Sequence, residues 1–188
     1  MIRMLAAFAG LVLIAGCATT ATTRAGATVT VPSTTAPARS ATVNLAPASG
    51  SLVSGKLTAM PMGGGVHFTG EIGGLTRNAT HAIHVHEKGD CSAADASSAG
   101  GHFNPKNQPH GRPDNGAHHE GDMPNIVADA NGVARVNLHV QGITLGGAAA
   151  TDIAGRAVVV HAQADDYASQ PSGNSGARIA CGIVAAIR

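Results

Sequence analysis

Large aromatic side chains are nearly missing from this sequence, which contains no Trp, one Tyr and three Phe among its 188 residues. A core without them has to be filled by small and β-branched side chains. Such a core is typical of a β barrel or sandwich and not of a helical bundle rich in Leu and Met. Basic runs are also missing, because 12 Lys and Arg face 11 Asp and Glu and lie singly along the chain. Nucleic acid is therefore not an expected partner, since phosphate binding requires a basic patch.

The N-terminal apolar run, from Met4 to Ile14, is too short to span a bilayer, and Arg3 precedes it. This arrangement is typical of a secretory signal peptide, which we place at residues 1–16. The run ends in LIAGC, which resembles the lipobox of bacterial lipoproteins, so Cys17 is the expected lipidation site. Ordinary cleavage nearby is the alternative. We expect a lipoprotein of the bacterial periplasm or cell envelope that contacts the membrane through lipidated Cys17.

Residues 17–40 form the expected linker between the lipid anchor and the folded part of the chain. They are mostly Ala, Thr, Ser and Pro without periodicity, so they cannot bury enough apolar surface to offset the entropy of ordering. The folded domain is expected at residues 41–188. If Cys17 is acylated, Cys91 and Cys181 remain as a possible disulfide pair in an oxidising compartment.

Strand patterns dominate the domain and no segment has a convincing amphipathic helical period. In one of them Val66, Phe68 and Ile72 alternate with polar residues, which predicts a strand with one wet face. About eight such segments suggest an all-β, eight-stranded antiparallel Greek-key barrel or sandwich with long metal-binding and active-site loops. The expected strands are 41–46, 52–60, 66–73, the segment around His84 and His86, 124–128, 133–140, 156–161 and 180–187. Asn131-Gly132 predicts a hairpin turn between two of them.

Histidines are the chemistry-bearing residues of the chain. His84 and His86 are two residues apart, so on a strand their side chains point to the same face, opposite Ile83 and Val85. Alone, this pair also fits a strand with two exposed polar positions. Further candidate ligands follow in loops or at strand ends, namely His102, His110, His119, Asp122 and His161. Imidazole suits copper and zinc, and a carboxylate is a normal zinc ligand, so the set predicts two metal sites.

The long stretch between Lys88 and Met123 has no period, and a loop of this length is unusual unless it is functional and tied down. A Cys91–Cys181 cross-link could hold one end of it. The metal ligands His102, His110, His119 and Asp122 could hold the rest by wrapping around one ion.

Taken together, the motifs HVHE, GDC, GGHFNP, PHGRP, HHEGD, VVVHAQADD and GNSGARIACG resemble the copper, zinc superoxide dismutases, specifically their bacterial secreted branch. The resemblance covers about residues 41 to 187. It implies copper ligands His84, His86, His102 and His161, zinc ligands His102, His110, His119 and Asp122, a Cys91–Cys181 disulfide, a substrate-docking Arg178, and an Asp165 that hydrogen-bonds a histidine of each metal. One copper and one zinc per subunit are implied, with His102 bridging them.

The implied activity is conversion of two superoxide radicals and two protons to oxygen and hydrogen peroxide, as a defence against extracytoplasmic superoxide. Copper would be the redox metal, and His102 would act in catalysis together with Arg178. The assembly of bacterial relatives varies, so the resemblance implies either a monomer or a homodimer for this chain. A secreted copper buffer is the competing interpretation, but it would not need Arg178 and Asp165. A purely structural dismutase-like domain is a further alternative, and such domains usually lose ligands.

Four of the ten histidines stay outside the ligand set. His81 is expected to have a hydrogen-bonding role in the core, and His67 and His139 to be exposed or locally bonded. His118 adjoins His119 and is the alternative zinc ligand, although the H-x-G-D spacing favours His119. The short loop from Ala162 to Ala177 lacks the Lys and Glu residues that guide the substrate in eukaryotic members, so the sequence leaves the strength of electrostatic steering open.

Overall fold

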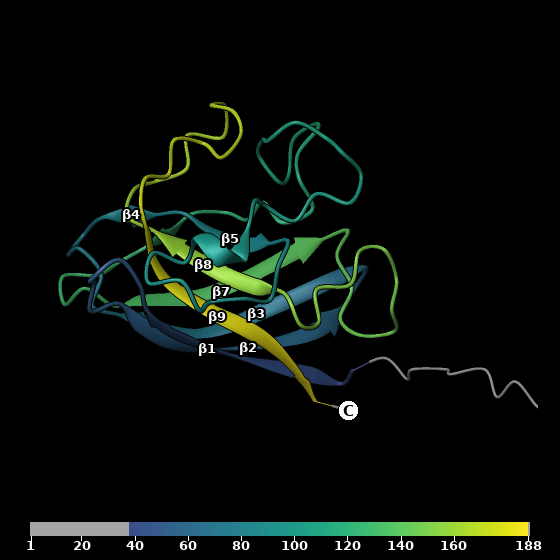
Figure 1. Cartoon of the computed structure of the whole chain (residues 1–188), viewed down its shortest axis with the longest axis horizontal. Coiled ribbons are helices and arrows are strands. Elements are labelled where there is room, and N and C mark those ends of the chain that lie inside the picture. Colours follow the sequence, from purple (N-terminus) through teal and green to yellow (C-terminus); the bar gives the residue numbers. More distant parts are fainter. Residues whose placement is uncertain (1–37, 188) are drawn as a thin grey trace, which may run out of the picture. The chain divides into compact units, whose positions relative to one another are not determined.

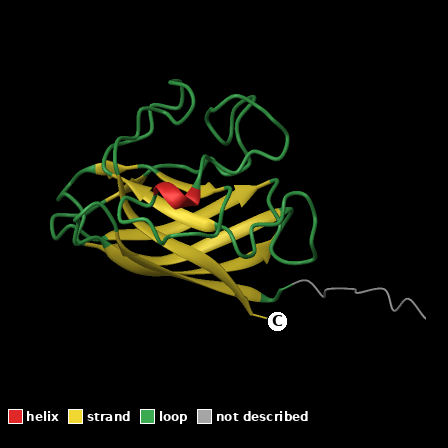
Figure 2. Cartoon of the chain, viewed as in Figure 1, coloured by secondary structure: helices red, strands yellow, loops and turns green. Residues whose placement is uncertain are grey.

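The computed structural model describes residues 38–187, which form one β barrel from which two long loops project on one side (Figure 1). The strands are β1 (Ser40–Pro47), β2 (Ser54–Met62), β3 (Gly65–Gly73), β4 (Thr80–His81), β5 (Ile83–His86), β6 (Ile126–Val127), β7 (Ala134–Gln141), β8 (Ala157–His161) and β9 (Arg178–Ile187). A single 3-10 turn, η1 (Ser97–Ala99), is the helix that Figure 2 shows in red. The expected signal peptide, Cys17 and nearly all of the expected linker lie outside the described residues.

The strand order gives the Greek-key connection expected from the sequence. Seven strands form one antiparallel sheet in the order β5-β8-β9-β1-β2-β3-β7, and β4 pairs with β6. β6 lies beside β7 and β4 directly precedes β5, so the two ends of the sheet are joined into a barrel. Closure removes the free strand edges, which are otherwise prone to pair with other chains.

Small and β-branched side chains fill the barrel, as the lack of aromatic residues predicts. Val43, Leu57, Phe68, Ile83 and Val158 belong to one buried cluster, and each is fully shielded from solvent. Alternate residues of β3 face outward, so this strand has the predicted wet face. Across the described residues, no helix has the length and apolarity needed to cross a membrane.

Several expected strand boundaries differ from the structure. β2 ends at Met62 and not at residue 60, β9 begins at Arg178 and not at residue 180, and the short β4 was not expected. The expected strand 124–128 pairs only at Ile126 and Val127, because the backbone N–H of Asn125 donates to the Tyr167 hydroxyl and not to a neighbouring strand. Ala38, the first described residue, also packs against the barrel core. Ala38 is buried, its N–H donates to the carbonyl of Leu145 at 3.3 Å, and β1 starts at Ser40.

A disulfide joins Cys91, in the loop after β5, to Cys181 on β9. It closes a chain segment of 90 residues. A loop of that length gives about 4 to 5 kcal/mol of stabilisation in the chain-entropy account of disulfides. The cross-link therefore ties the loop that carries η1 to the barrel wall.

Candidate metal centre

β5 places His84 and His86 on the face opposite the barrel core, while Ile83 and Val85 pack inside. β8 pairs with one edge of β5. On the other edge the long loop returns as an irregular strand, in which the Val85 N–H donates to Gly121 and the Phe103 N–H donates to Val85. These contacts cover the outer face, so His84 and His86 are 0% and 1% exposed.

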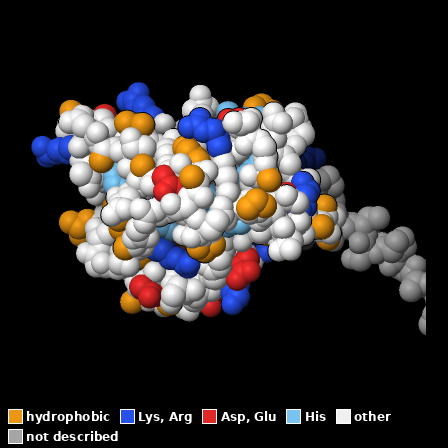
Figure 3. Space-filling model, turned by 90° about the horizontal axis from the view of Figure 1, so that it is seen from above, with side chains coloured by type: hydrophobic (Ala, Val, Ile, Leu, Met, Phe, Trp, Pro, Cys, Tyr) orange, Lys and Arg blue, Asp and Glu red, His pale blue; other side chains and the backbone are white. Residues whose placement is uncertain are grey.

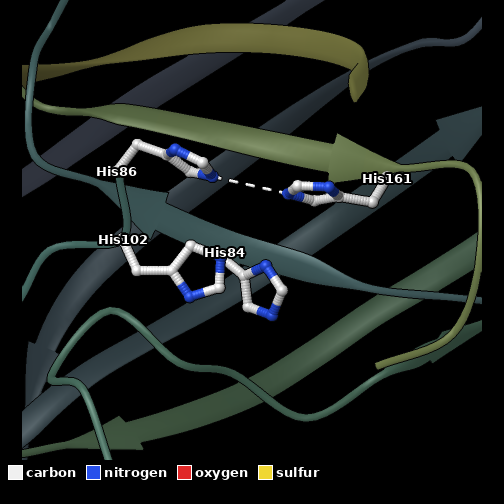
Figure 4. A group of neighbouring side chains, drawn as sticks. All are labelled: His84, His86, His102 and His161. Carbon is white, nitrogen blue, oxygen red and sulfur yellow. Dashed lines mark hydrogen bonds between the residues drawn. The ribbon is translucent and has the colours of Figure 1, made fainter. Parts of the chain in front are cut away.

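The structure brings the expected copper ligands together. His84, His86, His102 and His161 each offer a nitrogen, and these nitrogens all lie within 4.8 Å of one another. Figure 4 shows His86 and His161 pointing at each other from β5 and β8, with their Nε2 atoms 3.4 Å apart. The rings of His84 and His102 lie beside this pair, with centroids 4.0 Å apart.

A hydrogen bond through one ring nitrogen orients each of three of these four rings. His86 Nδ1 bonds the Gly100 carbonyl at 3.0 Å, and His84 Nε2 bonds Asp165 Oδ2 at 2.9 Å. His161 Nδ1 reaches the Gly176 carbonyl at 3.4 Å. An acceptor on one nitrogen keeps the proton there and leaves the lone pair of the other nitrogen for a metal. His84 Nδ1 is such an atom, because it is buried without a hydrogen-bond partner.

The second group contains the expected zinc ligands His102, His110, His119 and Asp122, again with ligand atoms within 4.8 Å of one another. Asp122 Oδ1 lies 2.8, 3.0 and 3.2 Å from Nδ1 of His102, His110 and His119. The other carboxylate oxygen accepts the backbone N–H groups of Gly111 and His119. Three imidazoles and a carboxylate are a normal donor set for tetrahedral zinc, so these residues fit that metal.

His102 belongs to both groups. Its Nδ1 faces Asp122, whereas its Nε2 is buried and has no hydrogen-bond partner among the described residues. Buried polar atoms normally have a partner, so an unpaired nitrogen beside three other imidazole rings fits a ligand of a metal ion. The two groups therefore meet in one imidazole.

Burial and neighbouring carboxylates have opposite effects on the pKa values of the histidines. Burial, with help from neighbouring imidazoles, lowers the pKa of His102 to about 4 and that of His161 to about 3. Burial would also lower the pKa of His110, but its bonds to Asp122 and Asp165 outweigh that and raise it to about 9. In the metal-free protein the rings of His102 and His161 are thus neutral at pH 7, while His110 is protonated.

Comparison with known proteins identifies the family of this chain. Residues 53–184 match the family model described as copper/zinc superoxide dismutase (SODC). A Cu-Zn superoxide dismutase of Aquifex aeolicus (strain VF5) is 40% identical over 135 residues, which are 70% of this chain and 79% of the relative. One of Caulobacter vibrioides is 40% identical over 136 residues, 70% of this chain and 78% of the relative.

Comparison with solved structures finds proteins of similar fold. The crystal structure of a SOD-like protein from Bacillus subtilis has a TM-score of 0.69 and 36% identity, and the match covers 76% of this chain and 97% of that chain. The chain belongs to the copper/zinc superoxide dismutase family. It is therefore an oxidoreductase that uses copper and zinc, as the sequence motifs imply.

For a superoxide dismutase, the access route to the metals matters as much as the ligands. A cavity of about 550 Å³ opens over His86, His102 and His161, and Arg178 lies in its wall. Arg178 Nη1 and Nη2 donate to the carbonyls of Ala96 and Gly100, both at 2.7 Å. The loop held by the disulfide thus fixes this guanidinium beside the dismutase copper group.

Seen from the loop side in Figure 3, histidine emerges at the surface of the dismutase only in small pale-blue areas. On the same face Lys and Arg side chains lie in separate places and do not form a stripe. Among the residues that line the cavity, Arg178 is the one Lys or Arg side chain.

Two histidines outside the ligand groups form hydrogen bonds to backbone carbonyls. His81 Nδ1 bonds the carbonyl of His161 at 3.0 Å inside the protein, as its expected core role requires. His118 Nδ1 bonds the Gly116 carbonyl, and the zinc-type group of the dismutase contains His119 and not His118.

Sequence reasoning missed the residues that hold Asp165 in place. The Asn125 side chain donates to the Asp165 carbonyl and accepts its N–H, both at 2.9 Å. Gly173 has a φ of +67°, and a Cβ there would lie 1.8 Å from Asp165 Oδ1. Only Gly fits this position. Gly173, the first glycine of the GNSG motif, was the available sequence signal for this contact. Its proximity to Asp165 depends on how the loop folds, so no local pattern predicts it.

Proposed function

We propose that this dismutase holds copper with His84, His86, His102 and His161 and zinc with His102, His110, His119 and Asp122. The observation that carries the assignment is the shared imidazole of His102. Its Nδ1 lies 2.8 Å from Asp122 and its Nε2 is buried without a partner. One ring can serve two metals only through both nitrogens, which requires the imidazolate form.

Copper bound by imidazoles supplies a one-electron exchange in both directions, whereas zinc has no redox chemistry and fixes geometry and charge. The chain itself binds the substrate, superoxide, and supplies protons. In the complete reaction two superoxide radicals and two protons give one oxygen and one hydrogen peroxide.

Arg178 is proposed to dock superoxide. A guanidinium stays charged at any relevant pH and has five N–H donors, of which Ala96 and Gly100 occupy two. The remaining donors can hold a small anion in the cavity next to His86 and His161. Burial lowers the pKa of Arg178 from its ordinary value, with Asp95 acting against this effect.

His102 is proposed to carry a proton at Nε2. This atom faces the copper group, and its ring lines the same cavity as Arg178. Nε2 could carry a proton when it is not a metal ligand, while Nδ1 remains directed at Asp122. The proton can then pass to the peroxide product, which leaves through the cavity.

We further propose that the enzyme works in the bacterial periplasm or cell envelope as a lipoprotein anchored through Cys17, where it removes extracytoplasmic superoxide. The support is the lipobox-like LIAGC at the N-terminus together with the Cys91–Cys181 disulfide, a bond that persists in oxidising compartments. The relatives named above, from Aquifex aeolicus and Caulobacter vibrioides, are also bacterial proteins.

Stopped-flow decay of superoxide with the purified full chain tests the proposal. Protein loaded with copper and zinc should accelerate decay, and the acceleration should disappear after copper removal and return when copper is restored. His161→Gln should lose copper and activity, whereas His118→Gln, which removes an imidazole outside both groups, should keep both. Tight copper binding without accelerated decay would instead identify a copper buffer.

A further inference from the structure

The outer wall of the barrel carries two histidines that neither the copper group nor the zinc group uses. His67 on β3 and His139 on β7 are directly opposite each other in the strand pairing. Their neighbours Val66, Phe68 and Val140 are buried in the core, so both imidazoles point to the outside. They form a cross-strand pair on the wet face of the sheet.

Their spacing resembles that of the proposed copper ligands. The ring centroids of His67 and His139 are 6.2 Å apart, with an angle of 32° between the planes. Within the copper group, His102 and His161 have the same centroid distance of 6.2 Å, and His84 and His86 are 6.5 Å apart. The outer pair is therefore close enough for both rings to reach a single ion.

Both rings also have an unused nitrogen. The Nδ1 atoms of His67 and His139 are buried and have no hydrogen-bond partner among the described residues. Such atoms are normally paired, and two of them on adjoining rings form an exception that a shared ligand would explain. Since both side chains are only partly buried, each ring has room to turn its free nitrogen toward an ion.

A methionine lies next to the two histidines on the same face of the sheet. Met60 on β2 is the registered neighbour of His67, so Met60, His67 and His139 form one row across three strands. Met60 is 52% exposed and Met62, two residues further along the same face, is 49% exposed. Glu71, a carboxylate on this face, is instead paired with Arg135 at 3.4 Å.

We propose that this row is a third metal site, which binds one copper(I) ion through His67 and His139 with the Met60 thioether as the soft ligand. Imidazole suits several transition metals, but a thioether selects copper(I). Calcium and magnesium need oxygen ligands, which the row lacks. The site shares no residue with the proposed dismutase centre and binds copper independently of it.

The test uses the full chain already carrying one copper and one zinc. Copper(I) is added without oxygen in the presence of a chromophoric copper(I) chelator, and protein-bound copper is counted. One further copper(I) should bind, and His67→Gln and His139→Gln should each abolish this additional binding. His118→Gln is the matched control and should retain it.

Two further readouts separate a site from loss of fold or from general imidazole binding. X-ray absorption of the added copper should show sulfur scattering that Met60→Leu removes, and all variants should keep the wild-type superoxide decay rate and melting temperature. Absence of the extra copper(I) in the wild type overturns the proposal. So does its persistence in both histidine variants, or an equal loss in His118→Gln.

Discussion

Arg178 and His86 share one hydrogen-bond acceptor, the backbone carbonyl of Gly100, which receives Arg178 Nη2 at 2.7 Å and His86 Nδ1 at 3.0 Å. The proposed substrate-docking cation and a proposed copper ligand are thus positioned by the same atom. Gly100 ends η1, and the disulfide at Cys91 ties this loop to β9, the strand that begins with Arg178. Displacement of the loop would therefore move the anion site and the copper site together.

The first prediction concerns Arg178. Arg178→Ala should lower the second-order rate of superoxide decay several-fold with unchanged copper and zinc content, and Arg178→Glu should lower it further because it repels the anion. Added salt should slow the wild type more than either variant, since screening weakens only an existing attraction. Stopped-flow measurements at two ionic strengths test both effects.

Arg135→Ala is the matched control, because it removes the same charge from an exposed position on β7. It should leave the rate nearly unchanged. Equal rates for the wild type and Arg178→Ala would remove Arg178 from the mechanism.

The second prediction concerns Asp165, whose two carboxylate oxygens lie 2.9 Å from His84 Nε2 and 2.9 Å from His110 Nε2. Its pKa is held below the ordinary range by these bonds, which outweigh the effect of burial. Asp165→Ala removes the support of one histidine from each metal group and should weaken zinc binding about tenfold to a hundredfold. A competition titration with a zinc chelator measures the change.

Asp166→Ala is the control for this experiment, since that carboxylate bonds only to Ala168 and Ser169 on its own turn. Circular dichroism should show a preserved fold in both variants. Equal zinc affinity in the wild type and Asp165→Ala would contradict the assigned role.

The third prediction is a proton release on zinc binding. With a pKa near 9, His110 is protonated in the metal-free protein at pH 7, and zinc has to displace that proton. Calorimetry in buffers of different ionisation enthalpy should therefore detect about one proton released per zinc at pH 7, and fewer as the pH approaches 9. Heats that do not depend on the buffer would count against it.

The same shift affects the metal-free fold. A raised histidine pKa stabilises the folded state fully below the ordinary value of 6.5, and this contribution is lost as the pH rises through about 9. His102 and His161 act in the opposite sense, because their lowered pKa values remove stability as the pH falls below 6.5 toward about 4 and about 3.

The fourth prediction concerns location. Cys17→Ser should move the protein from the membrane fraction to a soluble fraction, or block its processing, and should leave the activity of the purified domain intact. Fractionation followed by immunoblotting measures the first effect. A wild-type protein that is fully soluble and starts well after Cys17 would show that the lipid anchor is absent.

The sequence by itself determined the strands and the candidate ligands. The alternation of Val66 and Phe68 with His67 and Thr69 follows from the two-residue repeat of a strand, and His84-Val85-His86 follows the same rule. The low aromatic content likewise determined the character of the core. These features depend on neighbours within a few residues, so a linear pattern records them.

Only the tertiary structure decided how the ligands are held. The bonds from His84 to Asp165 and from Arg178 to Gly100 join residues 81 and 78 positions apart. No local pattern encodes which nitrogen of each ring meets which acceptor, because that depends on how the loops close over β5. The row of Met60, His67 and His139 arises in the same way, since the register of three strands, and not their separate sequences, places these side chains together.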